Sequence, residues 1–184
     1  MNQNPWQIVQ SKVVYDNPWI GLTEYDVINP NGGKGIYGKV HFKNTAIGVL
    51  VLDDDWNTYI VGQYRFVLDQ YSWEIPEGGG KLGTDPLKGA KRELLEETGL
   101  KADHWEYLLG MHLSNSVSDE WGVVFIARGL SQHTAMPEET EQLQVRKIPF
   151  DHLLNMVDKG EITDSLTVAA VYKVAFLRAQ GRLK

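Results

Sequence analysis

The sequence contains no cysteine among its 184 residues. Disulfide bonds and thiolate metal ligands are therefore excluded. Its five histidines are scattered without the spacing of a zinc site, so none is assigned a role. Positive charge is not in excess either, because the formal net charge is -6 and the sequence pI is about 5.3. This balance argues against nonspecific binding to nucleic acid or to a membrane surface, and it requires metal or local basic residues to receive an anionic substrate.

Long apolar runs are also missing. No run approaches the length of a membrane span, and the N-terminus has no basic region followed by an apolar stretch. Hydrophobic residues nevertheless make up 42% of the chain, which is enough for a core. These features predict a cytoplasmic protein with one domain of ordinary size and room for a small appendage.

Runs of β-branched and aromatic residues predict strands, and the end of the chain predicts helices. The expected strands are 6–15, 19–28, 36–42, 46–52, 58–65, 72–75, 104–112, 120–127 and 143–148, with a loop over 131–142 and helices over 151–159 and 164–179. The turn signal Asn31-Gly32-Gly33 suggests that the first three strands form an antiparallel sheet. Strands that come before one central and two final helices indicate an α+β fold.

The central helix is the stretch around which the chain is organised. Pro86 suits its first turn, Thr84 or Asp85 suits its N-cap, and Gly99 suits its C-terminal stop. Spacings of three and four residues place Glu93, Glu96 and Glu97 on one face.

That acidic face is costly, because like charges at these spacings repel and anions near a helix C-terminus oppose the macrodipole. Each penalty amounts to a few tenths of a kcal/mol up to roughly 1 kcal/mol. A divalent cation would turn the penalty into a binding site, since hard cations prefer carboxylate oxygens. The simpler alternative is a solvated acidic face.

The residues around this helix resemble the Nudix box, G-x5-E-x7-R-E-U-x-E-E-x-G-U, in which U is aliphatic. Gly78 opens the box, and the second half is filled in register by Arg92, Glu93, Leu94, Glu96, Glu97, Gly99 and Leu100. One position departs from the pattern, because Thr84 stands where the box has its first glutamate. The resemblance therefore predicts a cation site built from the three later glutamates.

The resemblance extends over most of the chain and is closest to the ADP-ribose and nucleotide-sugar pyrophosphatase branch. The segments Gln63–Arg65, Trp73–Gly78 and Lys159–Thr167 look like that branch. It implies a mixed β-sheet sandwiched between helices, preceded by a small N-terminal antiparallel sheet. Residues 1–42 would be that sheet and would exchange between subunits of a homodimer, and residues 43–184 would be the Nudix hydrolase domain.

The family chemistry implies Mg²⁺ bound by carboxylates of the box, with Mn²⁺ as a substitute. Glu93 and Glu97 are expected to be the principal ligands, Glu96 is next, and the backbone carbonyl of Glu77 would complete the site. Arg92 can reach Glu96 one turn further on and steer the carboxylates. A plain helix salt bridge is compatible with the same role.

A general base often lies outside the box in this branch, on a loop before the final strand. Glu139 matches that position best, and Glu141 is the second candidate on the loop. A metal-bound carboxylate within the box, such as Glu96, is a further alternative. Solvated surface glutamates remain the simpler interpretation of the loop residues.

Four residues are expected to contact substrate. Arg65 could pair with a phosphate, with the partner subunit or with a structural carboxylate. Trp19 could stack on a nucleobase or lie in a core or an interface. Glu120 lies where members of the branch bind the nucleoside or sugar, and Gly78 is placed with them. The nearby segment Ser114–Ser116 replaces the Ser-Pro-Gly of many ADP-ribose enzymes, so GDP-mannose and other nucleotide sugars remain open.

The resemblance therefore predicts Mg²⁺-dependent hydrolysis of the diphosphate bond of a nucleoside diphosphate sugar. The products would be a nucleoside monophosphate and a sugar phosphate. The competing prediction is a non-catalytic Nudix module that senses nucleotides. Such modules usually have a degraded box or an added DNA-binding domain, whereas three box glutamates and the arginine are kept here.

Overall fold

The structure is a computed structural model that describes residues 3–135 and 142–183. Within these residues the chain forms ten strands and three helices, and none of the helices is long and apolar enough to cross a membrane. The strands are β1 (Gln7–Asp16), β2 (Ile20–Ile28), β3 (Lys34–Phe42), β4 (Asn44–Val51), β5 (Asn57–Arg65), β6 (Gln70–Glu74), β7 (Glu77–Lys81), β8 (Leu100–His112), β9 (Trp121–Gln132) and β10 (Gln144–Pro149). The helices are α1 (Pro86–Thr98), α2 (Phe150–Asp158) and α3 (Ser165–Ala179).

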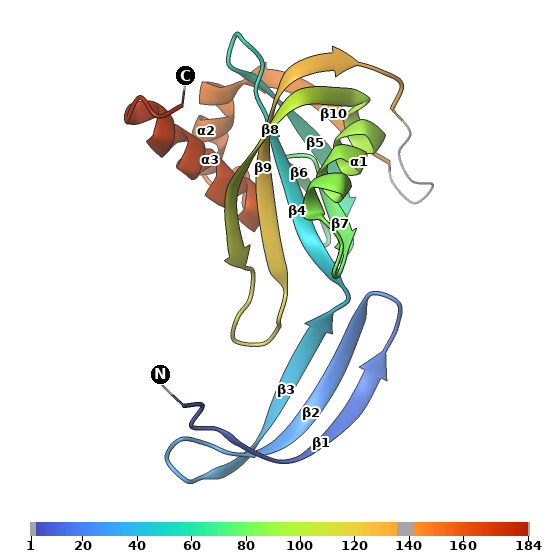
Figure 1. The fold of residues 1–184 in the computed structure, drawn as a ribbon, viewed down its shortest axis with the longest axis vertical. Helices are drawn as coiled ribbons and strands as arrows, with labels where there is room; N and C mark the ends of the chain where they lie inside the picture. The colour runs from blue at the N-terminus through green and yellow to red at the C-terminus, as the bar shows by residue number, and fades with distance from the viewer. Residues whose placement is uncertain (1–2, 136–141, 184) are drawn as a thin grey trace.

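The main sheet has the strand order β7-β4-β9-β8 and is mixed, because β4 and β9 run parallel while the other pairs are antiparallel. A second, antiparallel sheet has the order β10-β5-β6. Figure 1 shows α2 and α3 beside one face of the main sheet and α1 beside the other. The main sheet therefore lies between two helical layers.

Strand β4 contributes to two hydrophobic cores because its side chains alternate between the faces of the sheet. Val49 and Val51 pack with Leu94 of α1 in one core. Leu50 belongs to the other core, together with Val171 of α3. Full burial of one such side chain stabilises the fold by about 1.5–3 kcal/mol. A strand that is covered on both faces therefore needs apolar residues at successive positions, as β4 has.

The N-terminal sheet has the order β1-β2-β3 and is antiparallel throughout. Its β2–β3 turn lies at the expected glycines, and Gly32 has a φ of 84°, which glycine adopts without strain. The sheet extends away from the helices and the main sheet, as Figure 1 shows. With this sheet and the mixed sheet between helices, the predicted α+β fold is confirmed.

Three differences from the sequence prediction are larger than two residues. Strand β7 was not predicted, β8 begins at Leu100 rather than at residue 104, and β9 continues to Gln132 instead of giving way to a loop at Ser131. Strand β7 contains Gly78–Gly80, and glycine has a poor strand propensity that hides the element in the sequence. It forms because its backbone completes the edge of the main sheet beside β4.

Candidate active site

Helix α1 begins and ends where its capping residues require. Asp85 is the N-cap, and its side chain accepts a hydrogen bond of 3.0 Å from the Leu87 N–H. Gly99 ends the helix with a φ of 70°, and its N–H donates to the Leu95 carbonyl at 2.9 Å. Thr84, the alternative cap, instead donates its hydroxyl to the Lys81 carbonyl at 2.6 Å. The cap assignment to Asp85 is thereby decided, and Thr84 stabilises the preceding turn.

The carboxylates of Glu93 and Glu97 are not part of a solvated face. Glu93 is 8% exposed and Glu97 is 3% exposed, and both lie against strand β7. One Glu97 carboxylate oxygen accepts a hydrogen bond of 3.0 Å from the Glu77 N–H. The Glu93 carboxylate occupies the space beside Gly78, where a Cβ atom would lie 2.3 Å from it. Burial of an acidic side chain is costly unless positive charge or hydrogen bonds compensate it.

Arg92 supplies part of that positive charge. Its guanidinium donates to the Glu96 carboxylate at 2.5 Å, forms an ion pair with Glu93 and donates to the Gly79 carbonyl at 2.9 Å. The predicted pairing of Arg92 with Glu96 is thus present in the structure. Because the same guanidinium contacts both carboxylates and β7, it fixes the acidic face of α1 against the strand.

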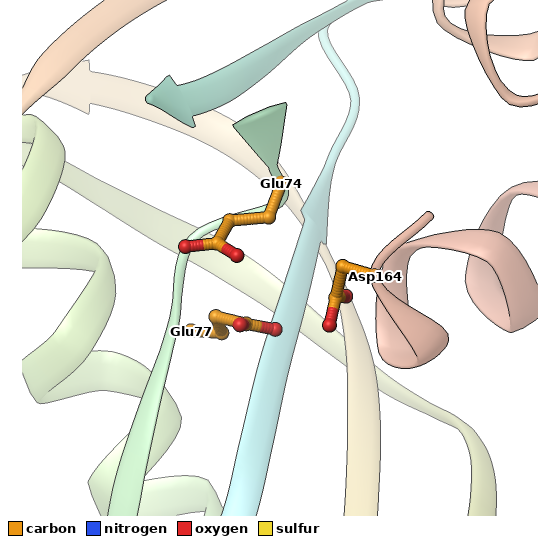
Figure 2. Close-up of side chains that lie close together, drawn as sticks. All are labelled: Glu74, Glu77 and Asp164. Atoms are coloured by element: carbon orange, nitrogen blue, oxygen red, sulfur yellow. The ribbon is translucent and has the colours of Figure 1, made fainter. Parts of the chain in front are cut away.

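A second acidic cluster was not predicted as a site. One carboxylate oxygen from each of Glu74, Glu77 and Asp164 lies within 4.8 Å of the other two, and Figure 2 shows the side chains converging from β6, β7 and the start of α3. Arg65 joins the cluster, with N–O distances of 2.6 Å to Glu74 and 2.5 Å to Glu77. The ion-pair alternative for Arg65 is therefore observed, and its contact with substrate stays a prediction. Only tertiary folding brings these residues together, so no spacing in the sequence indicated Glu74 or Asp164.

Charge in this second cluster is unbalanced, because three carboxylates face one guanidinium. Burial and the neighbouring charges of Asp164 and Glu74 raise the pKa of Glu77 well above its usual range, although Arg65 acts in the opposite direction. Burial likewise raises the pKa of Glu74 despite its contacts with Arg65. One Glu77 oxygen is buried and has no hydrogen-bond partner among the described residues. The arrangement favours binding of a proton or a cation.

A cavity of about 760 Å³ lies beside this cluster. It falls in the range of small-molecule sites. The structure brings together around it all four residues expected to contact substrate, namely Arg65, Trp19, Glu120 and Gly78. Burial raises the pKa of Glu120. Their contact with a substrate stays a prediction, but their common location is a feature of the fold.

Strand β7 connects the cavity to the box helix. Glu77, Gly78 and Gly79 line the cavity, while the same strand contacts Glu93 and Glu97 on α1. The box carboxylates on α1 therefore contact the same strand, β7, that lines the cavity. The two candidate bases on the loop, Glu139 and Glu141, lie outside the described residues, so their assignment stays a prediction.

Comparison with known proteins identifies the family. A model described as the NUDIX domain matches residues 42–169, and one described as the nucleoside diphosphate sugar hydrolase N-terminal domain matches residues 6–40. The chain belongs to the Nudix family. The predicted class of enzyme, a Nudix pyrophosphatase that hydrolyses diphosphate linkages, is confirmed.

Two curated relatives of this Nudix protein align over most of its length. It is 30% identical to a methanol dehydrogenase activator of Bacillus methanolicus, over 96% of this chain and 94% of the relative. It is also 30% identical to an ADP-ribose pyrophosphatase of Mycobacterium tuberculosis, over 95% of this chain and 85% of the relative. A crystal structure of an ADP compounds hydrolase superposes with a TM-score of 0.86 at 20% identity and full coverage of both chains. That likeness shows a common fold.

Proposed function

We propose that the enzyme hydrolyses the diphosphate bond of a nucleoside diphosphate sugar, with ADP-ribose as its first candidate substrate. The observation that carries the proposal is the pair of buried carboxylates on α1, Glu93 and Glu97, which lie against β7, a strand that also lines a cavity of about 760 Å³. ADP-ribose is favoured over GDP-mannose because the Mycobacterium tuberculosis relative is named for it and covers nearly the whole chain. The products would be AMP and ribose 5-phosphate.

The acidic residues fit the divalent cation that Nudix hydrolases generally use. Carboxylate oxygens are the ligands that Mg²⁺ prefers, and Glu93 and Glu97 present two of them on α1 beside β7. Glu93, Glu97 and Glu96 would hold Mg²⁺ together with the Glu77 carbonyl, and Mn²⁺ would substitute. The bound cation would neutralise the diphosphate and lower the pKa of a water molecule.

Other side chains would orient the reactants. Arg92 holds Glu93 and Glu96 in position. Trp19 is 65% exposed and lines the cavity, which suits an aromatic ring that stacks on a nucleobase. Glu139 is proposed as the general base, with Glu141 and Glu96 as alternatives, and it would accept a proton from the attacking water.

A homodimer is proposed from exposed apolar residues. The side chains of Ile8, Val13 and Ile36 on the N-terminal sheet are between 63% and 70% exposed. Phe66 and Val67, at the β5–β6 turn, are more than 90% exposed and line the cavity. A second copy would bury both surfaces and complete the cavity wall. The variant Phe66→Ser should then shift light scattering toward the monomer mass and raise KM, and a fully active wild-type monomer would refute this assignment.

Hydrolysis tests the proposal directly. The enzyme is incubated with ADP-ribose, GDP-mannose or ADP-glucose in Mg²⁺, with and without EDTA, in water enriched in ¹⁸O. We expect AMP and ribose 5-phosphate from ADP-ribose, one of them carrying the label, and no product in EDTA. If none of the substrates yields a monophosphate although ADP-ribose binds, the proposed hydrolysis is refuted, and the alternative of a nucleotide-sensing module takes its place.

A further inference from the structure

The loop between β8 and β9 holds the N-terminal sheet. The Val40 N–H donates to the Val117 carbonyl at 2.8 Å, and the Asp119 N–H donates to the Val40 carbonyl at 3.2 Å. The Tyr37 hydroxyl donates to the Ser116 carbonyl at 2.7 Å. Strand β3 is thereby attached to the main part of the molecule at a point separate from its covalent connection to β4.

The Asp119 carboxylate makes three further contacts with β3. One oxygen accepts the Phe42 N–H at 3.0 Å. The other lies 2.8 Å from His41 Nδ1 and 3.2 Å from Lys39 Nζ. Although burial acts in the opposite direction, these contacts lower the pKa of Asp119, so the carboxylate is ionised at neutral pH. Four consecutive residues of the strand thus contact this loop or its carboxylate, which makes Asp119 the centre of the attachment.

The N-terminal sheet and the β8–β9 loop, which this attachment joins, both contribute residues to the cavity wall. Phe42 lines the cavity from the N-terminal sheet, as does Ile20, its partner in β2. Glu120, the residue after Asp119, lines it from the main part of the molecule. A displacement of the Asp119 contacts would therefore change the spacing between two walls of the same cavity.

Lys43 links the parts of the cavity wall that the N-terminal sheet contributes. Its side chain donates to the Asp16 carboxylate at 2.6 Å and to the Asn17 carbonyl at 2.5 Å. Its N–H donates to the Trp19 carbonyl at 2.9 Å. These bonds tie the β1–β2 turn, which carries Trp19, to the residue directly after Phe42. Movement of Phe42 would accordingly carry Trp19 with it.

We propose that Asp119 is a positioning residue that fixes the N-terminal wall of the cavity against the main part of the molecule and thereby sets substrate affinity. The kinetic side of this inference rests on the proposed hydrolysis, whereas its structural side does not. Asp119 acts through Phe42 and Trp19 and is not expected to contact the reacting atoms. Its loss should therefore weaken binding without changing the chemistry that the box residues perform.

The kinetic experiment compares two variants with a matched control. Asp119→Ala should raise KM for ADP-ribose on the order of tenfold, with kcat within about twofold of wild type. Asp119→Asn keeps an acceptor for the Phe42 N–H but loses the charge, so its KM should lie between those of the wild type and Asp119→Ala. The control Asp151→Ala removes a surface ion pair with Arg178, of 2.6 Å, and should leave both constants unchanged. A fall in kcat at constant KM would overturn the proposal.

A distance measurement tests the structural side without any substrate. Because the chain contains no cysteine, spin labels can be attached uniquely through Lys34→Cys on the N-terminal sheet and Lys101→Cys on β8. The labelled protein is diluted into an excess of unlabelled protein, so that only distances within one chain are recorded. We expect a single narrow distribution that broadens or shifts in Asp119→Ala but not in Asp151→Ala.

The two measurements separate the possible failures. If the wild type hydrolyses no nucleotide sugar but the distance distribution broadens in Asp119→Ala, the proposed function fails and the attachment stands. If the distribution is unchanged while the melting temperature falls, Asp119 only stabilises the fold and the positioning role is refuted. An unchanged distribution with unchanged KM refutes it as well.

Discussion

The substitution Gly78→Ala should place a methyl group where the Glu93 carboxylate lies. A Cβ atom at residue 78 would be 2.3 Å from the carboxyl carbon and from one oxygen of Glu93. Favourable contacts between heavy atoms lie near about 3.5 Å, so the carboxylate must move by roughly 1 Å. The colliding group is the end of a flexible side chain, and the fold should therefore survive.

The expected consequence is a loss of turnover. A displacement of about 1 Å in a group that positions the reactants costs on the order of 10²-fold in rate. The assay measures kcat and KM for ADP-ribose over a series of Mg²⁺ concentrations, together with the melting temperature. The control is Gly35→Ala on β3, where an added Cβ meets nothing within 4 Å. Full turnover of Gly78→Ala at every Mg²⁺ concentration would show that the position of the Glu93 carboxylate is not needed.

Three further outcomes are expected. Glu97→Gln should lower turnover by several orders of magnitude at an unchanged melting temperature, because it removes a ligand charge without changing shape; unchanged turnover in saturating Mg²⁺ would refute the ligand assignment. Asp85→Ala should cost about 1 kcal/mol in urea unfolding through loss of the N-cap, and Thr84→Ala should cost less. Asp53 has a pKa of about 2 rather than 3.8, because hydrogen bonds from Lys147 and Asn57 outweigh burial. Its ionised form therefore stabilises the fold above pH 3.8, and this contribution is lost as the pH falls through about 2, so the stability difference between wild type and Asp53→Asn should vanish in acid.

Local signals in the sequence were sufficient for many elements. Pro86 and Gly99 predicted the ends of α1 because first-turn proline and left-handed glycine act within a few residues. The apolar run of β4 predicted a buried strand for a similar reason, since the signal is the apolar character of successive residues and requires no knowledge of distant ones. Propensity fails at β7, where the partner strand rather than the glycine-rich sequence decides the conformation.

The candidate site was predictable only in part. The carboxylates of α1 share a helical face, and helical spacing is visible in a sequence. By contrast, Glu74 and Asp164 are 90 residues apart, and only the packing of α3 beside the β6–β7 turn brings them together. The burial of Glu93 and Glu97 is likewise a tertiary property, because it depends on the approach of β7.

The alternation of β4 between two cores has a consequence for how the protein unfolds. Val49 and Leu50 are neighbours in the chain but belong to different cores, so neither core can lose its packing without disturbing the strand that both share. The amides of β4 and of its partner β9 should therefore exchange with solvent only through global unfolding, and they should be the last to take up deuterium. Strand β1 is exposed along its entire length, and in a single chain its amides should exchange through far smaller openings.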